Sequence, residues 1–172
     1  QLHIASGGNG SLSHLSAELF KSMAGVDLVH VPYKGAAPGL TDLAAGQVAA
    51  MIINIPSAQG LLKSGRLKAL ATTGQQRAAA LPEVPTLDES GLKGYETTSW
   101  FALLAPARTP AAAIDRLQAE TAKALATAAV RERLATMGLT PVGNTPAQFD
   151  AFMRAEIAKY AKVIKDAGVK ID

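Results

Sequence analysis

The sequence predicts an α/β fold built on a parallel sheet, and three observations support this expectation. Between residues 2 and 71, short apolar segments alternate with segments whose apolar residues recur at helical spacing, as in βαβ units. Glycine, proline or serine separates one segment from the next. Of the 172 residues, 48% are hydrophobic and 18% are charged, so the chain has enough apolar surface for a packed core. Its length suits one domain, or one domain and part of another.

The first half of the chain is expected to alternate strands with helices. The predicted strands are residues 2–6, 28–31, 48–53 and 67–71, and the predicted helices are residues 11–23, 37–45 and 57–63. The first helix has Leu12, Leu15 and Leu19 on one face. Residues 48–53 form a continuous apolar run, which is typical of a strand buried on both faces.

The second half follows a different plan. Residues 74–94 form a long connection rich in proline and glycine, and connections of this length usually serve a function. Residues 96–104 are predicted to form a strand, and they include the only tryptophan. Helices are predicted at residues 111–126, at residues 130–137 and after Thr145, which caps a helix that begins with Pro146. These helices have apolar stripes but no sheet of their own, so they require a partner surface.

Composition excludes several classes of function. The net charge is +3 and the basic residues are scattered without interleaved aromatics, unlike a nucleic-acid-binding face. The chain has no cysteine, which excludes disulfides, thiolate metal sites and a cysteine nucleophile. No apolar run approaches the ~18 residues of a membrane span, and no signal peptide opens the chain.

The turn after the first strand is the strongest candidate binding site. It contains Gly7, Gly8, Asn9, Gly10, Ser11 and His14. A glycine-rich turn that opens a helix presents free backbone N–H groups and the positive end of the helix to an anion. An ordinary strand-to-helix turn with a serine cap is an equally good interpretation of the same residues. The turn matches neither the dinucleotide fingerprint nor the phosphate-binding P-loop.

His14 allows three interpretations. It can donate to a carboxylate, act as a base for Ser11, or brace the loop. The bracing role is favoured because no spacing in the sequence singles out an acid that would orient His14 as a base. His3 and His30 lie on predicted strands and do not share metal-ligand spacing with His14.

Further candidate residues follow the later strands. They are Tyr33, Lys34 and Gly35 after the second strand, Asn54 and Ser57 after the third, and Ser99 and Trp100 between the two halves. In open parallel sheets the carboxyl ends of the strands form the ligand crevice, so the first three loops are expected at one edge. A solvated Lys34, a packed Tyr33 and a core Trp100 remain alternatives.

With these residues considered, the chain resembles the substrate-binding proteins of tripartite tricarboxylate transporters, the Bug family. The resemblance rests on residues 8–11 with His14, on residues 29–38 and 81–86, and on the Gly94-Tyr-Glu, Ser99-Trp-Phe and Leu104-Ala-Pro-Ala motifs. It implies a periplasmic-binding-protein-like (type II-like) fold, a periplasmic location and no catalysis or cofactor. It also implies capture of a small carboxylate between two lobes and delivery to membrane permease subunits.

The resemblance implies a division of the chain near residue 98. Residues 1–98 correspond to the second, ligand-loop domain, and residues 99–172 to a crossover strand and helices that return to the first lobe. The opening part of the family's first lobe has no counterpart in this sequence. Weak ligand binding is therefore expected, and so is a homodimer or domain swap that covers the exposed helices. A Ser/His hydrolase and a truncated remnant without a ligand are the alternatives.

Overall fold

The computed structural model describes residues 1–170 and divides the chain into two compact units. The first unit comprises Gln1–Ser99 together with the residues from Tyr160 onward, and the second is Trp100–Lys159. The residues from Tyr160 onward therefore group with the first unit, although the sequence pattern placed them with the second.

The first unit contains the parallel sheet. Its strands are β1 (Leu2–Ser6), β2 (Leu28–Pro32) and β3 (Ala50–Met51), in the order β2-β1-β3. Both neighbours pair with β1 in the parallel direction, and Ile4 lies opposite both His30 and Ala50. The predicted parallel α/β architecture is confirmed, although the strand predicted at residues 48–53 is only two residues long.

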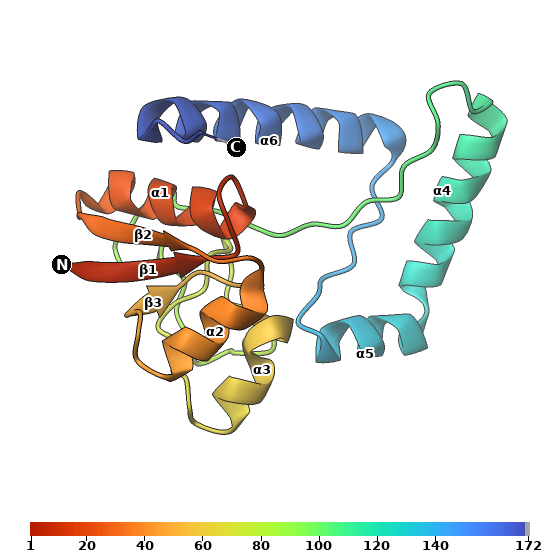
Figure 1. Cartoon of the computed structure of the whole chain (residues 1–172). Helices are drawn as coiled ribbons and strands as arrows, with labels where there is room; N and C mark the ends of the chain where they lie inside the picture. The colour runs from red at the N-terminus through yellow and green to blue at the C-terminus, as the bar shows by residue number, and fades with distance from the viewer. Residues whose placement is uncertain (171–172) are drawn as a thin grey trace. The chain divides into compact units, whose positions relative to one another are not determined.

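Helices cover both faces of this sheet (Figure 1). They are α1 (Leu12–Ala24), α2 (Ala36–Ala44) and α3 (Ile55–Lys63). The chain passes from β1 to β2 in one direction across the sheet and from β2 to β3 in the other. Because both crossovers are right-handed in such folds, α1 and α2 lie on opposite faces. Fully buried Ala5 and Ala17 lie at the centre of this core.

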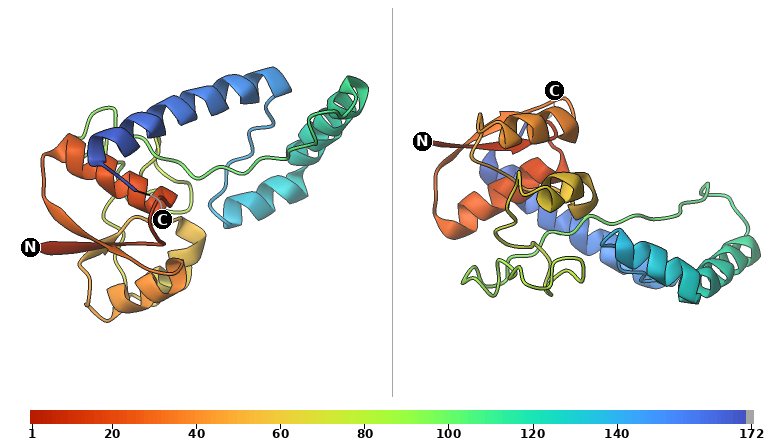
Figure 2. Two further views of the ribbon diagram at one scale, coloured as in Figure 1. Left: turned by 45° about the horizontal axis from the view of Figure 1, so that its top comes forward. Right: turned by 90° about the horizontal axis from the view of Figure 1, so that it is seen from below.

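The segment after α3 has no regular strand, so the strand predicted at residues 67–71 is wrong. Leu70 is 72% exposed, and within residues 1–170 the segment makes one β-pairing, an isolated bridge between Thr72 and Thr86. The turns that follow are coloured yellow-green in Figure 2, and the side chain of Tyr95 anchors them to α1. Tyr95 is 1% exposed and donates its hydroxyl to the carbonyl of Ser16 in α1 at 2.9 Å.

The second unit is helical. Its helices are α4 (Ala111–Ala126), α5 (Ala128–Thr136) and the first part of α6 (Pro146–Ala167). The predicted helices and the start at Pro146 are confirmed, whereas the strand predicted at residues 96–104 is wrong. Residues 99–105 are extended, and no backbone hydrogen bond joins them to any other described residue.

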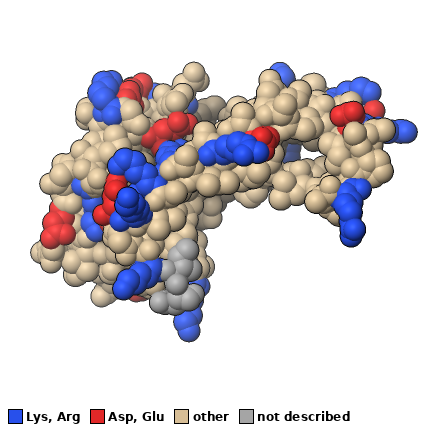
Figure 3. All heavy atoms as spheres, turned by 90° about the horizontal axis from the view of Figure 1, so that it is seen from above, with Lys and Arg blue, Asp and Glu red and all other residues tan. Residues whose placement is uncertain are grey.

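Charge is dispersed on the face shown in Figure 3, where Lys and Arg alternate with Asp and Glu. None of the helices within residues 1–170 is both long and apolar enough to span a bilayer.

Candidate carboxylate-binding site

The loop between β1 and α1 adopts a conformation that only glycine accommodates easily. Gly8 has φ +130° and Gly10 has φ +70°, both in regions that side chains disfavour. The N–H of Gly7 donates to Oγ of Ser13 at 2.9 Å, and Oγ of Ser11 donates to the carbonyl of Gly8 at 2.7 Å. The loop is therefore a rigid, internally hydrogen-bonded turn.

The start of α1 leaves backbone donors without a partner in the helix. Ser11 is the N-cap residue, and its hydroxyl accepts the N–H of His14 at 3.3 Å. The N–H groups of Leu12 and Ser13 have no acceptor within the helix, as is usual for a first turn. These two donors, together with the positive end of the helix, favour an anion.

The start of α2 has the same property and lies beside the first loop. Its N-cap residue is Gly35, which has no capping side chain, so the N–H groups of Ala36 and Ala37 lack intrahelical partners. The N–H of Gly35 donates to the carbonyl of Gly7 at 3.1 Å. A side chain at Gly7 would lie 3.7 Å from the N atom of Ala36. Two helix N-termini thus converge on the carboxyl edge of β1 and β2.

The third loop is at the same edge of the sheet because β3 is parallel to β1. Asn54 caps α3 there, since its Oδ1 accepts the N–H of Ser57 at 3.0 Å. Both predicted residues of this loop are thus used in capping.

In the loop between β2 and α2, the side chains of Tyr33 and Lys34 are poorly placed to bind a ligand. The Tyr33 hydroxyl donates to Oδ2 of Asp42 in α2 at 2.8 Å, and this bond raises the pKa of Tyr33. Lys34 is exposed to solvent. The N–H groups at the start of α2 are therefore better placed to bind an anion than the side chains of Tyr33 and Lys34.

A pair of stacked histidines lies beneath the loop. The rings of His14 and His30 are parallel within 5°, with centroids 3.7 Å apart. Burial lowers the pKa of His14, and burial together with the neighbouring His14 lowers the pKa of His30 to about 4. Both rings are therefore neutral at neutral pH, and an anion at this site would be held by N–H dipoles. His30 was not among the residues selected from the sequence.

Ser11 and His14 are not arranged as a nucleophile and its base. Nδ1 of His14 accepts the N–H of Gly10 at 3.1 Å, and the Ser11 hydroxyl donates to the carbonyl of Gly8. Nε2 of His14 lies 3.7 Å from the Glu18 carboxylate. The ring thus braces the loop, which is the interpretation that the sequence favoured.

The last two predicted residues lie where the chain passes from one unit to the other. Ser99 ends the first unit, and Trp100 packs edge-on against Phe149 and Phe152 within the second unit, with ring centroids 5.7 Å from each. A role for Ser99 or Trp100 in ligand binding stays a prediction.

A surface hollow of about 260 Å³ in the first unit does not suit a carboxylate. Asp88 and Glu96 line it, together with Gln75, Gly94 and Tyr95. A hydrogen bond from the N–H of Gly94 lowers the pKa of Asp88, with a smaller contribution from Lys93, so its carboxylate is charged and would repel an anion. The residues that the structure describes contain no group of three or more His, Asp or Glu placed to hold a metal ion.

The sequence matches the model of the tripartite tricarboxylate transporter family receptor (TctC) over residues 1–169. It is 39% identical to protein BugT of Bordetella pertussis over 162 residues, which are 94% of this chain and 50% of BugT. The chain spans about half the length of the first curated relatives it matches.

Solved structures show the same likeness. A protein of R. palustris with adipate superposes with a TM-score of 0.87 and 41% identity, over 98% of this chain and 56% of that chain. The periplasmic binding protein BugD superposes with a TM-score of 0.81 and 34% identity, over 98% and 57%.

Proposed function

Because the chain belongs to the tripartite tricarboxylate transporter receptor family, we propose that it serves in an extracytoplasmic solute-binding protein that captures a small carboxylate. The observation that carries this proposal is the convergence of the α1 and α2 N-termini at the carboxyl edge of the sheet. The free N–H groups there hydrogen-bond carboxylate oxygens in the way that helix N-termini bind anions. The related structure with adipate supports the same ligand class.

The residues proposed for the site are those of the three loops and of the passage between the two halves of the chain. The proposed N–H donors are those of Leu12 and Ser13 at the start of α1 and of Ala36 and Ala37 at the start of α2. The loops Gly7–Ser11 and Tyr33–Gly35 hold these helix starts in place through their own hydrogen bonds, and His14 braces the first loop. The capping pair Asn54 and Ser57 limits the third side of the site. Ser99 and Trp100, which open the second of the two predicted domains (residues 1–98 and residues 99–172), complete the set of proposed ligand-binding residues.

A Ser/His hydrolase is the less favoured alternative. Its nucleophile and base would need a direct hydrogen bond, whereas Ser11 and His14 both bond to the loop backbone. The chain is accordingly proposed to catalyse nothing. Its proposed partners are the permease subunits of a tripartite transporter, and the likeness to periplasmic BugD supports a periplasmic location.

Carboxylate binding is tested by thermal unfolding against mono-, di- and tricarboxylates, amino acids and aromatic acids. We expect one class of acid to raise Tm, and to do so only at millimolar concentration. Ligands of two-lobed receptors are buried by both lobes, and this chain spans about half the length of such relatives, so its affinity should be low. A ligand at ten times its Kd stabilises the native state by about 1.4 kcal/mol, which corresponds to ~3–6 °C at this chain length. The corresponding amides, which lack the charge, serve as controls. Equal shifts with acids and amides, or none with either, would contradict the proposal.

We also infer that the chain associates with a second copy through the extended segment of residues 99–105. Phe101, Leu103 and Leu104 are 83%, 72% and 75% exposed, and the backbone of the segment has no hydrogen-bond partner among the described residues. An apolar extended segment with unpaired backbone groups is a template for strand pairing. Two copies of this segment can pair their backbone N–H and C=O groups with each other, in a homodimer or a domain swap.

Sedimentation velocity over a wide concentration range should therefore show a dimer. Leu103→Lys should shift the protein to the monomer by placing a charge in the paired segment. Leu70→Lys, at an equally exposed leucine, is the matched control and should leave the dimer intact. A wild-type monomer at every concentration would refute this association.

A further inference from the structure

The stacked histidines join α1 to β2, whereas the glycine-rich loop of Gly7–Ser11 joins α1 to β1. His14 belongs to α1 and is 7% exposed, and His30 belongs to β2 and is half-buried. Their 3.7 Å centroid separation is close contact over nearly the whole ring face. The orientation of His14 is therefore set in part by His30 rather than by its own helix alone.

Each ring reaches a different part of the loop with its outer edge. Nδ1 of His14 accepts the N–H of Gly10 at 3.1 Å. Nε2 of His30 lies 2.6 Å from Oγ of Ser6, which is fully buried, and that oxygen accepts the N–H of Gly8 at 3.2 Å. Of the two loop glycines with positive φ, Gly10 thus bonds directly to the stack and Gly8 is linked to it through the Ser6 hydroxyl.

We propose that His30 is a positioning residue for carboxylate capture, which holds the Gly8–Gly10 turn through Ser6 and through the stacked ring of His14. The role rests on the proposed function, because the turn opens the anion-binding start of α1. His30 does not contact the ligand. It fixes the backbone so that the N–H groups of α1 and α2 face one space, which reduces the ordering cost of binding.

The charge state of the stack adds a second signature. The charged groups that act on both rings are Glu18 and Lys21 of α1, and the hydroxyl of Ser6 faces His30 from β1. Since the ordered turn keeps His30 neutral, a loosened turn binds protons more readily. The stability of the ordered turn therefore falls as the pH is lowered from 6.5, the ordinary pKa of histidine, towards about 4. Above pH 6.5 its stability no longer depends on the protonation of His30.

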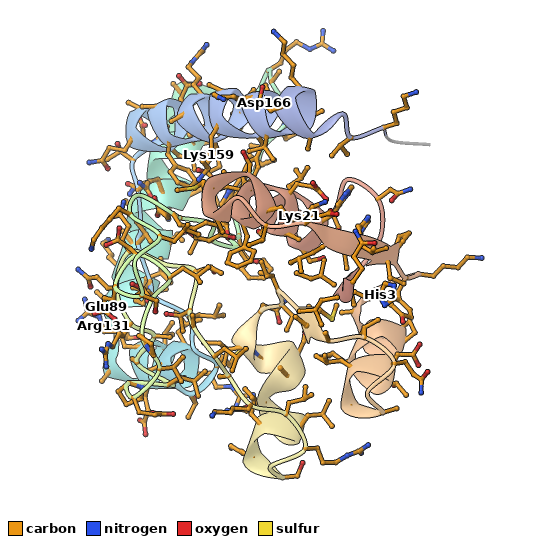
Figure 4. The ribbon with its side chains drawn as sticks, turned by 90° about the vertical axis from the view of Figure 1, so that its left-hand side faces the viewer. His3, Lys21, Glu89, Arg131, Lys159 and Asp166 are labelled. Atoms are coloured by element: carbon orange, nitrogen blue, oxygen red, sulfur yellow. The ribbon has the colours of Figure 1, made fainter. Side chains whose placement is uncertain are left out.

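The experiment compares His30→Phe, which keeps a stacking ring but loses Nε2, with His30→Gln, which keeps an N–H near Nε2 but loses the stack. Ser6→Ala removes the hydroxyl from the other side. His3→Phe is the matched control, because His3 is an exposed histidine on β1 (Figure 4). The first readout is amide hydrogen exchange of Gly8 in the ligand-free chain, and the second is the affinity for adipate.

We expect His30→Phe and Ser6→Ala each to speed exchange of the Gly8 amide about tenfold, the effect of one lost hydrogen bond of ordinary strength. Adipate affinity should fall by a similar factor. The double variant should be no worse than either single variant, since both break one chain of contacts. His30→Gln should retain more Gly8 protection than His30→Phe, whereas a role in packing alone predicts the reverse.

In wild-type protein the amide signals of Gly8 and Gly10 should shift with the ring signals of His30, with one midpoint near pH 4. Wild-type exchange rates in His30→Phe would overturn the positioning role. If the ring variants do not fold, amide signals of Gly8 and Gly10 that do not follow the ring signals of His30 in wild-type protein would overturn it. If wild-type protein does not bind adipate but Gly8 amide exchange responds to the variants as expected, the result would count against the proposed ligand class and would support the role of His30.

Discussion

Tyr95→Ala should lower the free energy of unfolding by about 3–5 kcal/mol, as expected for loss of a large aromatic core side chain. Tyr95 is 1% exposed, and its ring packs edge-on against Phe20 with centroids 6.5 Å apart. Its hydroxyl donates to the carbonyl of Ser16. Because residues 74–97 have little regular structure, this side chain is the main anchor that joins them to α1. Urea unfolding monitored by circular dichroism measures the loss.

Two controls separate the contributions to that loss. Tyr95→Phe keeps the ring and removes the hydroxyl, which bonds to Ser16 and makes a longer 3.4 Å contact with Thr97, so it should cost only about 1–2 kcal/mol. Leu70→Ala, at a leucine that is 72% exposed, should change stability by less than about 0.5 kcal/mol. A cost below about 1 kcal/mol for Tyr95→Ala would show that residues 74–97 are not packed on α1.

The first half of the fold could be predicted from the sequence because its signals are local. An apolar segment, a glycine or serine turn and an amphipathic helix recur three times, and each repeat predicts a strand, a loop and a helix. Right-handed crossovers then leave few ways to arrange the strands. The placement of Gly7–Ser11 and Tyr33–Gly35 at the same edge followed from this topology alone.

The strands predicted at residues 67–71 and 96–104 failed for the opposite reason. An apolar, β-branched or aromatic run is compatible with a strand, but a strand forms only where a neighbour accepts its backbone hydrogen bonds. Leu70 and Phe101 are largely exposed, and residues 99–105 pair with no described residue. Pairing is a property of distant residues, which periodicity does not report.

The importance of His30 could not be predicted for a related reason. Spacing rules test whether residues share a helix face or a metal-ligand pattern, and His14 and His30 do neither. They meet because β1 and β2 are adjacent and α1 packs on them. One signal was present: each histidine lies near the end of its segment that borders a candidate loop, His14 in the first turn of α1 and His30 close to the end of β2. Tyr33 is the converse case, a loop residue whose hydroxyl is occupied by Asp42 of the next helix.

Gly8→Ala should weaken carboxylate binding at least tenfold and destabilise the chain by about 2 kcal/mol, within the range for a strained backbone conformation. At φ +130° a side chain is strained whatever the space around it, and the added Cβ would lie 3.2 Å from the carbonyl oxygen of Tyr33. The same residue donates its N–H to Ser6 and accepts the hydroxyl of Ser11. Relief of the strain would therefore break the contacts that hold the loop.

Gly60→Ala is the matched control for this change. Gly60 lies in the interior of α3, and an added Cβ there meets nothing within 4 Å. Alanine should raise stability by about 0.5–1 kcal/mol, because it is the better helix former, and should leave binding unchanged. Calorimetric titration with the acid identified by thermal unfolding, together with urea unfolding, measures both effects. Equal affinity for Gly8→Ala and wild type would mean that the ligand does not use this loop, and the carboxylate site would then have to be sought elsewhere in the chain.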